Sequence, residues 1–309
     1  MSTRPILIAG PTASGKSALA LALAEATGGV IVNADSQQVY RDWRVLTARP
    51  SPEEAAQAPH RLYGHVPLDA EYSVGHWLRE VEPLLTEGPR PIIVGGTGLY
   101  FKALTEGLAP IPPVPAEVRA AGEAELERLG PEAFAAAFAD RDAKTAARID
   151  LANPRRVLRA WEVLEASGLG LAAWQARTPA ALVPLADCTA IALTPDRDWL
   201  YARCEARFDQ MLAEGALDEV RTVMDLDVPP AAPGLRAVGA PELMAHLRGE
   251  ISLSQATDKA KMETRRYAKR QSTWIRNQMA EWTRLDPRDA QARDTLRHSL
   301  QAASASTRA

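Results

Sequence analysis

Short apolar runs alternate with helical stretches over much of the chain. Four such runs are bounded by Gly, Pro or polar residues: PILIA (5–9), GVIVNA (29–34), RPIIVG (90–95) and CTAIAL (188–193). Continuous apolar runs of this length predict strands buried on both faces, as in a parallel sheet. Residues 17–26 and 196–213 are helical in composition. Strands that alternate with helices predict an α/β fold with a doubly wound parallel sheet.

The middle of the chain is helical in composition and lacks strand-like runs. The breaker APIPPVP at 109–115 precedes this region, and Pro179 and Pro184 close it. Prolines at both ends predict a helical insertion joined to the sheet by hinges. We therefore expect a core (1–111 and 186–284), an insertion (112–185) and a C-terminal segment (285–309), whose end from Gln301 to Ala309 is expected to be disordered.

A long helix is predicted from Ser252 to Trp274, because Ser252 and Gln255 have the spacing of a capping box. Residues 259–276 carry seven basic side chains against one acid, Glu263. Helical geometry gathers basic positions on one face (Lys261, Arg265, Lys269, Arg276) and apolar positions on another (Ala256, Ala260, Tyr267, Trp274). The basic face either follows the phosphates of a nucleic acid or is only a solvated face.

Composition narrows the class of protein. A net charge of −3 and a pI near 6.0 exclude a nucleic-acid binder that acts through its overall charge. Cys188 and Cys204 are too few for a disulfide framework or a zinc site and are expected to be buried, inert thiols. The histidines lack metal-ligand spacing, and no stretch of 18 apolar residues occurs. These features predict a soluble, cytoplasmic protein without a membrane partner.

The stretch GPTASGKS at 10–17 fits the pattern G-x-x-x-x-G-K-[ST] between an apolar strand and a helix. Gly10 and Gly15 let the backbone wrap so that successive N–H groups point at one anion. Lys16 adds a positive charge, and the Ser17 hydroxyl can ligate Mg²⁺. The whole loop is therefore predicted to bind a polyphosphate: Gly10, Pro11, Thr12, Ala13, Ser14, Gly15, Lys16 and Ser17.

An acidic residue at the end of a neighbouring strand is also needed in a P-loop ATPase. The strand at 90–95 ends instead in Gly95, Gly96, Thr97 and Gly98, without a carboxylate. Asp35 follows the second strand, and ligands of open α/β sheets bind outside the carboxyl ends of the strands. We expect Asp35 to face the same crevice as Lys16; the alternative is that it only caps the next turn through an Asx bond.

Three stretches together resemble one family. They are GPTASGKS, NADSQQVYR (33–41) and VGGTGLYFKAL (94–104), and they are similar to tRNA dimethylallyltransferases (tRNA isopentenyltransferases); KRQSTWIRN (269–277) is similar to the C-terminal signature of that family. The resemblance implies transfer of a dimethylallyl group from dimethylallyl diphosphate to the exocyclic amine of the adenosine 3′ to the anticodon, with release of diphosphate. The loop would then hold the leaving group rather than a nucleotide donor.

The resemblance also implies roles for single residues. Asp35 matches the family's proposed general base, Thr97 a position near the diphosphate, and Arg236 an arginine that binds pyrophosphate. With Lys16 these form the expected catalytic set, although Arg236 could instead be a solvated loop cation. The tRNA-contacting segments match Asp35, Ser36, Gln37, Gln38, Thr97, Arg119, Arg155, Arg156, Val157, Leu158 and Arg159. Gln37 and Gln38 suit base-edge hydrogen bonds.

A second basic cluster lies in the insertion, with six basic residues against two acids over 141–159. Two such arms could hold one stem-loop, with sequence read in the unpaired loop. We accordingly expect the anticodon stem-loop of tRNA as the macromolecular partner and a monomeric enzyme.

Two loops depart from the family pattern. Residues 45–50 read VLTARP where I-G-T-A-K-P is common, and 239–242 read GAPE where G-Y-K/R-E is common. Two other functions stay open at this point. One is a small-molecule P-loop kinase, which would release ADP from ATP; the other is a nucleotide-gated RNA-binding module without catalysis.

Overall fold

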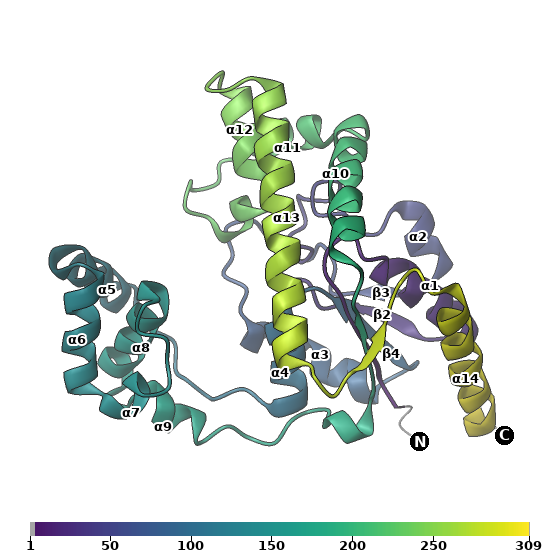
Figure 1. Cartoon of the computed structure of the whole chain (residues 1–309), viewed down its shortest axis with the longest axis horizontal. Coiled ribbons are helices and arrows are strands. Elements are labelled where there is room, and N and C mark those ends of the chain that lie inside the picture. The colour runs from purple at the N-terminus through teal and green to yellow at the C-terminus, as the bar shows by residue number, and fades with distance from the viewer. Residues whose placement is uncertain (1–3, 309) are drawn as a thin grey trace. The chain divides into compact units, whose positions relative to one another are not determined.

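The chain divides into two compact units in the computed structural model, which describes residues 4–308 and their side chains as far as Ala302. One unit runs from the first described residue to Thr105 and continues from Val183 into the C-terminal helix, and the other is Glu106–Leu182 (Figure 1). The second unit corresponds to the insertion expected at 112–185, with borders a few residues earlier in the chain.

The first unit contains a six-stranded, wholly parallel sheet with the strand order β3-β2-β4-β1-β5-β6. The strands are β1 (Ile6–Ala9), β2 (Val30–Asn33), β3 (His60–Arg61), β4 (Pro91–Gly95), β5 (Thr189–Leu193) and β6 (Thr283–Leu285). The predicted α/β class and the four predicted strands are confirmed. The edge strands β3 and β6 were not predicted, because runs of two and three mostly polar residues carry no apolar signal.

Helices cover both faces of this sheet. Ile6 and Ile8 of β1 face a core shared with α1 (Lys16–Thr27) and α14 (Ala290–Arg308). Leu7 and Ala9 face the opposite core, shared with α3 (Val74–Thr86) and α4 (Gly98–Glu106). The alternation follows from the two-residue period of a strand, and it explains why the strands are apolar throughout.

The C-terminal helix α14 corrects the prediction of a disordered end. Residues 301–308 are helical, and Ala309 lies outside the described residues. Leu296 and Leu300 are four residues apart, so they share one helix face, which packs into the core with Leu19 and Leu23 of α1. An amphipathic face of this kind is stabilised by tertiary packing, which low-complexity composition alone does not reveal.

A second group of helices forms its own core around the segment that follows β2. These helices are α10 (Arg197–Ala213), α11 (Ala216–Met224), α12 (Ala240–Leu247) and α13 (Leu253–Gln278). Trp43 is fully buried among Phe208, Val220 and Leu243, and its indole N–H donates to Gly234 O at 2.7 Å. The loop after β2 is thereby held against α10. The short helix α2 (Pro52–Gln57) follows this loop.

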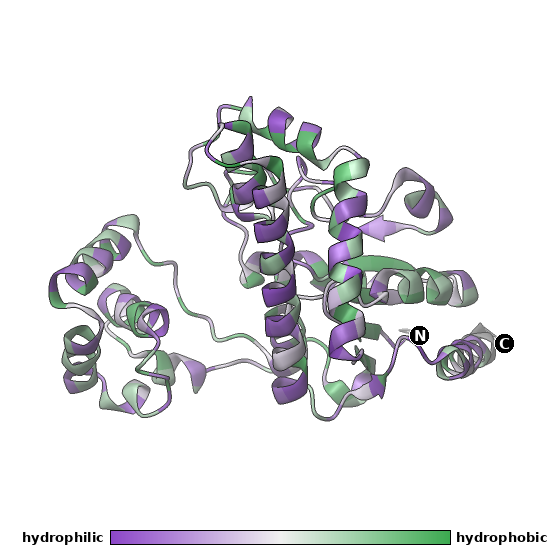
Figure 2. Cartoon of the chain, turned by 45° about the horizontal axis from the view of Figure 1, so that its top comes forward, coloured by the Kyte–Doolittle hydropathy of each residue, from purple (hydrophilic) through white to green (hydrophobic). Residues whose placement is uncertain are grey.

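The long helix α13 begins as predicted, with a complete capping box between Ser252 and Gln255. Ala256, Ala260 and Ala268 are buried along it, whereas the rest of its surface is largely hydrophilic (Figure 2). Small residues on the buried face let the helix approach its neighbours closely. Within residues 4–308, no helix is both long enough and apolar enough to cross a bilayer.

The second unit is helical throughout its described elements. It contains α5 (Ala116–Leu129), α6 (Pro131–Arg141), α7 (Ala143–Ala146), α8 (Pro154–Ser167) and α9 (Leu171–Gln175). Val157 and Leu158 are 0% and 6% exposed and pack against Phe134 and Phe138. The prediction that these two side chains contact tRNA is therefore wrong, because they form the core of α8 and leave only their exposed neighbours at the surface.

Candidate functional site

The phosphate loop joins the end of β1 to the start of α1. Ala13 and Gly15 have φ values of 61° and 87°, in the left-handed region that permits a tight, concave turn of backbone N–H groups. A Cβ on Gly10 would stand 2.7 Å from Ser14 Oγ, so this position has room only for glycine. Helix α1 starts at Lys16, and the free N–H groups of its first turn favour an anion.

Lys16 is buried beside this turn, with 8% of its surface exposed. Its Nζ atom donates to Pro11 O at 3.4 Å. Burial lowers the pKa of Lys16 to about 8, while the nearby negative charge of Asp35 opposes the shift and the guanidinium of Arg207 adds to it. An anion bound at the loop would offset the cost of burying this ammonium group.

A cavity of about 730 Å³ opens at the loop. Its walls come from the phosphate loop (Gly15, Lys16, Ser17), from the segment Arg44–Glu54 and from α10. Ser17 is exposed at this wall, where its hydroxyl can contact a ligand or a metal ion. The cationic side chains in this lining, among them Lys16, Arg203 and Arg207, suit an anionic group such as a diphosphate.

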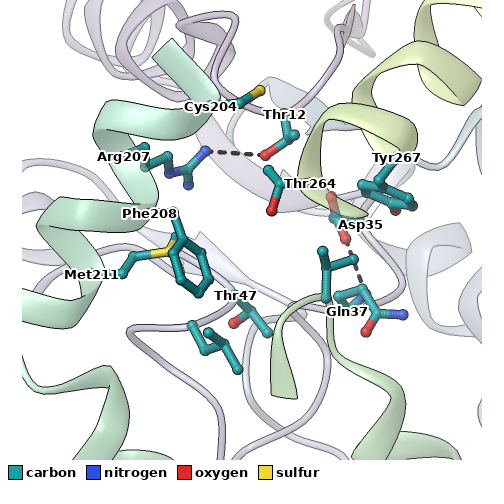
Figure 3. A pocket seen from close by; sticks show the side chains of 12 residues that line it. Thr12, Asp35, Gln37, Thr47, Cys204, Arg207, Phe208, Met211, Thr264 and Tyr267 are labelled. Carbon is teal, nitrogen blue, oxygen red and sulfur yellow. Dashed lines mark hydrogen bonds between the residues drawn. The ribbon is translucent and has the colours of Figure 1, made fainter. Parts of the chain in front are cut away.

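Two arginines of α10 reach the phosphate loop. Arg203 Nε donates to Ala13 O at 2.9 Å, and its guanidinium lies 4.8 Å from the centre of the Trp199 ring. Arg207 donates to Thr12 Oγ1 at 3.2 Å (Figure 3). Burial lowers the pKa of Arg207. Sequence reasoning missed this pair, although its spacing of four residues on the helix after β5 was an available signal.

Arg236, by contrast, does not line this cavity. It is an exposed residue at the end of the short helix η2 (Pro233–Arg236), where its charge lies close enough to Tyr40 to influence the phenol. The geometry therefore does not support the pyrophosphate contact expected for Arg236. The arginines that the structure brings to the phosphate loop are those of α10.

A second, smaller cavity of about 50 Å³ adjoins the first and contains Asp35. Figure 3 shows Thr12, Asp35, Gln37 and Tyr267 at its polar side. Its apolar wall is formed by Leu46, Phe208, Met211 and Val238. Arg207 and Met211 line both cavities, so the loop site and the Asp35 site are neighbours.

Asp35 lies at the carboxyl end of β2 and is 6% exposed. Its Oδ1 accepts the Gln37 N–H at 3.0 Å, which is the Asx bond of the alternative interpretation. Asn33 fixes the same turn, because its amide donates to Asp35 O at 2.9 Å and its Oδ1 accepts the Asp35 N–H at 2.9 Å. The carboxylate thus caps the turn, as the alternative interpretation has it, and also lines a cavity next to the one that Lys16 lines.

The turn after β4 closes the other side of Asp35. Thr97 Oγ1 accepts the Ser36 N–H at 2.9 Å and donates to Ser36 Oγ at 3.2 Å. Tyr267 of α13 is close by: burial raises its pKa and so does the charge of Asp35, whereas a hydrogen bond with Thr97 opposes these effects. Thr97, Ser36 and Asp35 thus lie together at this turn.

Gln37 and Gln38, which follow Asp35 in the chain, make different contacts. Gln38 is buried, and its Nε2 donates to Thr47 O at 2.8 Å and Ala48 O at 2.7 Å. It therefore anchors the segment that carries Leu46, and the prediction that it reads a base edge is wrong. Gln37 lines the Asp35 cavity, and its Oε1 is buried there without a hydrogen-bond partner among the described residues.

The loop at 45–50, where the sequence departs from the family pattern, is anchored by Glu219 of α11. The Glu219 carboxylate accepts the N–H groups of Arg44, Val45 and Leu46 at 2.6, 2.9 and 2.9 Å. Leu46, which stands in place of a glycine, is 5% exposed and helps to form the apolar wall of the Asp35 cavity. The substitution therefore changes the lining of the site without loosening the loop.

Glycines after β4 allow α13 to approach the reaction centre. A Cβ on Gly96 would stand 2.0 Å from Gln271 Nε2, and one on Gly98 would stand 2.1 Å from the Trp274 ring. Gln271 Oε1 accepts the Thr12 N–H at 2.8 Å, so α13 also contacts the phosphate loop. Gly96 and Gly98 are explained by this close approach, and Gly95 by its contact with the Ala34 backbone.

We expect the substitution Gly98→Ala to lower the free energy of unfolding by about 1–3 kcal/mol, because the added methyl group overpacks the contact with Trp274. Urea unfolding of the purified protein measures this difference. The double variant Gly98→Ala with Trp274→Ala is the control: the alanine at 98 should cost clearly less when the indole is absent. Equal costs in both backgrounds would contradict the assigned contact.

The basic residues of α13 divide into two groups. Lys261 forms an ion pair with Asp209 and Arg265 one with Glu205, both on α10. These two side chains hold α13 against α10, so either would have to exchange its ion-pair partner in order to follow a phosphate. Lys269 and Arg276 are exposed and keep the prediction of phosphate contacts open.

The basic residues of α8 and its neighbours show a similar division. Arg141 pairs with Glu165, and Arg159 pairs with Glu162 at 3.3 Å. Arg155 and Arg156 are exposed in the first turn of α8. Exposed ion pairs contribute little to stability and can exchange partners, so all four side chains are available to an anionic ligand.

Both cysteines are buried, as predicted. Burial raises the pKa of the Cys188 and Cys204 thiols to about 11 in each case. Among the side chains that the structure describes, no group of three or more His, Cys, Asp or Glu residues is placed to hold a metal ion.

Comparison with protein families places two matching models on the chain. The model described as IPP transferase matches residues 38–278, and the model described as isopentenyl transferase matches residues 4–65. A tRNA dimethylallyltransferase of Cereibacter sphaeroides is 61% identical over 281 residues, which cover 91% of this chain and 88% of that protein. A tRNA dimethylallyltransferase of Dinoroseobacter shibae is 59% identical over 290 residues, covering 93% of this chain and 96% of that protein.

Solved structures agree with these sequence relatives. The full-length tRNA isopentenylpyrophosphate transferase of Bacillus halodurans superposes with a TM-score of 0.69 and 31% identity, over 99% of both chains. A eukaryotic dimethylallyltransferase, described as acting on tRNA, superposes with a TM-score of 0.80 and 26% identity, over 95% of this chain and 76% of that chain. The similarity thus extends over nearly the whole length of the sequence.

Proposed function

The chain belongs to the IPP transferase family of tRNA-modifying prenyltransferases, and we propose that it transfers a dimethylallyl group from dimethylallyl diphosphate to the exocyclic amine of the adenosine 3′ to the anticodon. One observation carries this proposal: the cationic cavity at the phosphate loop adjoins a second cavity that contains the Asp35 carboxylate. An anionic leaving group and a nucleophile that must lose a proton therefore have adjacent sites.

The phosphate loop would stabilise the departing diphosphate. Negative charge builds on this group as the carbon–oxygen bond breaks, so donors aimed at it stabilise the transition state more than the substrate. Lys16, Arg203 and Arg207 supply positive charge beside the loop. The Ser17 hydroxyl would hold Mg²⁺ together with diphosphate oxygens and water, and the ion would supply further charge neutralisation there.

Asp35 would act as the general base. The lone pair of the adenine amine is delocalised into the ring, so the amine is a weak nucleophile and must lose a proton as the new carbon–nitrogen bond forms. A carboxylate within hydrogen-bond reach can orient the amine and accept that proton. The Asx bond from Gln37 holds one carboxylate oxygen in place, which restricts rotation of the side chain.

The tRNA would bind through exposed basic and polar groups. The target base is stacked in the anticodon loop and must swing out to reach Asp35, at a cost of roughly a few kcal/mol. Gln37 lines that cavity, Ser36 and Thr97 are bonded to each other beside Asp35, and all three are proposed contacts of the base. For the stem-loop backbone we propose Arg119, Arg155, Arg156, Arg159, Lys269 and Arg276. We further propose a monomeric, cytoplasmic enzyme.

A nucleoside mass measurement tests the reaction. The protein is incubated with unmodified tRNA, Mg²⁺ and either dimethylallyl diphosphate or ATP, and the tRNA is digested to nucleosides. The proposal predicts one adenosine heavier by a dimethylallyl group in the first reaction and no ADP in the second. ADP release with unchanged nucleosides would instead support the P-loop kinase, which the absence of an acid at the end of β4 disfavours.

Binding of inorganic diphosphate should depend on pH through Lys16. The lysine is charged below its pKa of about 8 and neutral above it, so its attraction for the anion is lost as pH rises through that value. We therefore compare the affinity for inorganic diphosphate of the wild-type protein with that of Lys16→Arg, which stays charged. The ratio of the two affinities should fall above pH 8 by up to about tenfold per pH unit, which is the largest slope that the loss of one proton can cause. Calorimetric titration across pH 6.5 to about 9.5 measures this ratio. A constant ratio would contradict a contact between Lys16 and the diphosphate.

A further inference from the structure

Gln271 of α13 lies between the phosphate loop and the glycine turn after β4, and 6% of its surface is exposed. Its Oε1 accepts the Thr12 N–H at 2.8 Å. This bond fixes the orientation of the side-chain amide, because a backbone N–H must face the oxygen and not the nitrogen. The Nε2 group therefore points away from the phosphate loop.

The Nε2 group of Gln271 is buried and has no hydrogen-bond partner among the described residues. The point where a Gly96 Cβ would stand lies 2.0 Å from this nitrogen and 3.3 Å from Asp35 Oδ2. The amide donor and the carboxylate oxygen thus border the same small space, which glycine keeps clear. A buried donor without a partner costs about 1–3 kcal/mol, so its retention calls for a reason.

We propose that Gln271 is a positioning residue that ties the phosphate loop to the general base. Its Oε1 holds Thr12, and its Nε2 donates a hydrogen bond to Asp35 Oδ2 in the reacting complex. Oδ1 already accepts the Gln37 N–H, so a second donor on Oδ2 fixes the plane of the carboxylate. Each oxygen keeps a further lone pair, one of which receives the proton of the adenine amine.

The consequence is a mechanical link between the two cavities. A diphosphate that binds to the phosphate loop and shifts its backbone also moves Thr12. Thr12 is hydrogen-bonded to the Gln271 amide, which orients Asp35. Occupancy of the anion site then prepares the base for the incoming adenine. A purely structural role for Gln271 would need only the Thr12 bond and would leave the base unaffected.

Substitutions at Gln271 separate these two roles. In Gln271→Glu one oxygen can still accept the Thr12 N–H, but the other repels the Asp35 carboxylate. We measure the single-turnover rate as a function of pH and call its rise at low pH the acid limb. We expect the acid limb to move to higher pH and the maximal rate to fall about 10- to 100-fold. Gln271→Met loses both bonds and should move the limb in the same direction by less.

The matched control is Gln278→Met, on the same helix. Gln278 is exposed and accepts a hydrogen bond from Lys102 at 2.9 Å, away from the reaction centre. Its pH profile should coincide with that of the wild-type protein. The charged and titratable groups whose fields couple to Asp35 are unchanged in all of these variants: Lys16, Tyr63, Tyr100, Arg207 and Tyr267.

An acid limb of Gln271→Glu that coincides with the wild-type limb would overturn the proposal, whatever the change in maximal rate or melting temperature. This inference rests on the proposed function, and the two fail in different ways. If the wild-type protein transfers no dimethylallyl group, the proposed function is wrong. If it transfers the group and the acid limb of Gln271→Glu coincides with that of the wild-type protein, only the proposed role of Gln271 is wrong.

A second measurement needs no substitution at 271. In protein labelled with ¹⁵N in glutamine side chains, adding inorganic diphosphate should move one amide resonance downfield as the Nε2 bond forms. Asp35→Ala removes the acceptor and should abolish this shift. An identical shift in both proteins, or no shift in either, would contradict the bond between Gln271 and Asp35.

Discussion

Replacing Asp35 by asparagine is expected to lower kcat by about 10²- to 10⁴-fold while tRNA affinity stays within roughly tenfold. The asparagine oxygen can still accept the Gln37 N–H, so the turn is kept and only the proton acceptor is lost. Single-turnover transfer to tRNA and a filter-binding titration measure the two quantities.

Asp35→Ala is the companion variant, because it removes the turn bond together with the base. If Asp35 only caps the turn, asparagine should retain activity and alanine should lose it. If Asp35 is the base, both variants should be slow by a similar factor. Wild-type turnover in Asp35→Asn would therefore contradict general-base catalysis by Asp35 and leave capping of the turn as its role.

Replacing Arg207 by alanine is expected to lower kcat by about 10²- to 10³-fold, as removal of one donor to a developing anion does. Arg207 lines both cavities and donates to Thr12 Oγ1, so its charge lies where the diphosphate departs. Steady-state kinetics with saturating tRNA measure the loss. Added guanidinium ions should restore part of the rate, because the truncated side chain leaves space in the cavity wall.

Arg236→Ala supplies the contrast for Arg207. Arg236 is exposed and outside both cavities, and an exposed charge contributes about 0–1 kcal/mol, so its removal should change kcat by less than about fivefold. A large loss of kcat in Arg236→Ala together with a small loss in Arg207→Ala would contradict the assignment of Arg207 as the arginine that stabilises the diphosphate. It would support Arg236 in that role, as the family resemblance implies.

The phosphate loop and Asp35 could be predicted from sequence because their chemistry is local. The loop is one continuous motif, and Asp35 follows an apolar strand whose carboxyl end must lie at the ligand-binding edge. The pairing of Gln271 with Thr12 could not be predicted in this way, because 259 residues separate the two positions. That contact exists only once α13 packs on the glycine turn.

Packing also explains the sequence predictions that were wrong. Val157 and Leu158 lie between exposed arginines in the sequence, but the helical period places both on the buried face of α8. Lys261 and Arg265 are basic positions on one face, and the acids that pair with them lie on α10. A pattern along one helix gives the direction of a side chain, whereas the partner that meets it comes from another part of the chain.

The structure of a ternary complex tests the central claim most directly. The protein would be crystallised with an anticodon stem-loop and an unreactive thio analogue of dimethylallyl diphosphate. The account predicts the diphosphate on the phosphate loop beside Lys16 and Arg207, with the Asp35 carboxylate about 2.6–3.2 Å from the adenine amine. A carboxylate turned away from the base, or a diphosphate bound elsewhere, would contradict it.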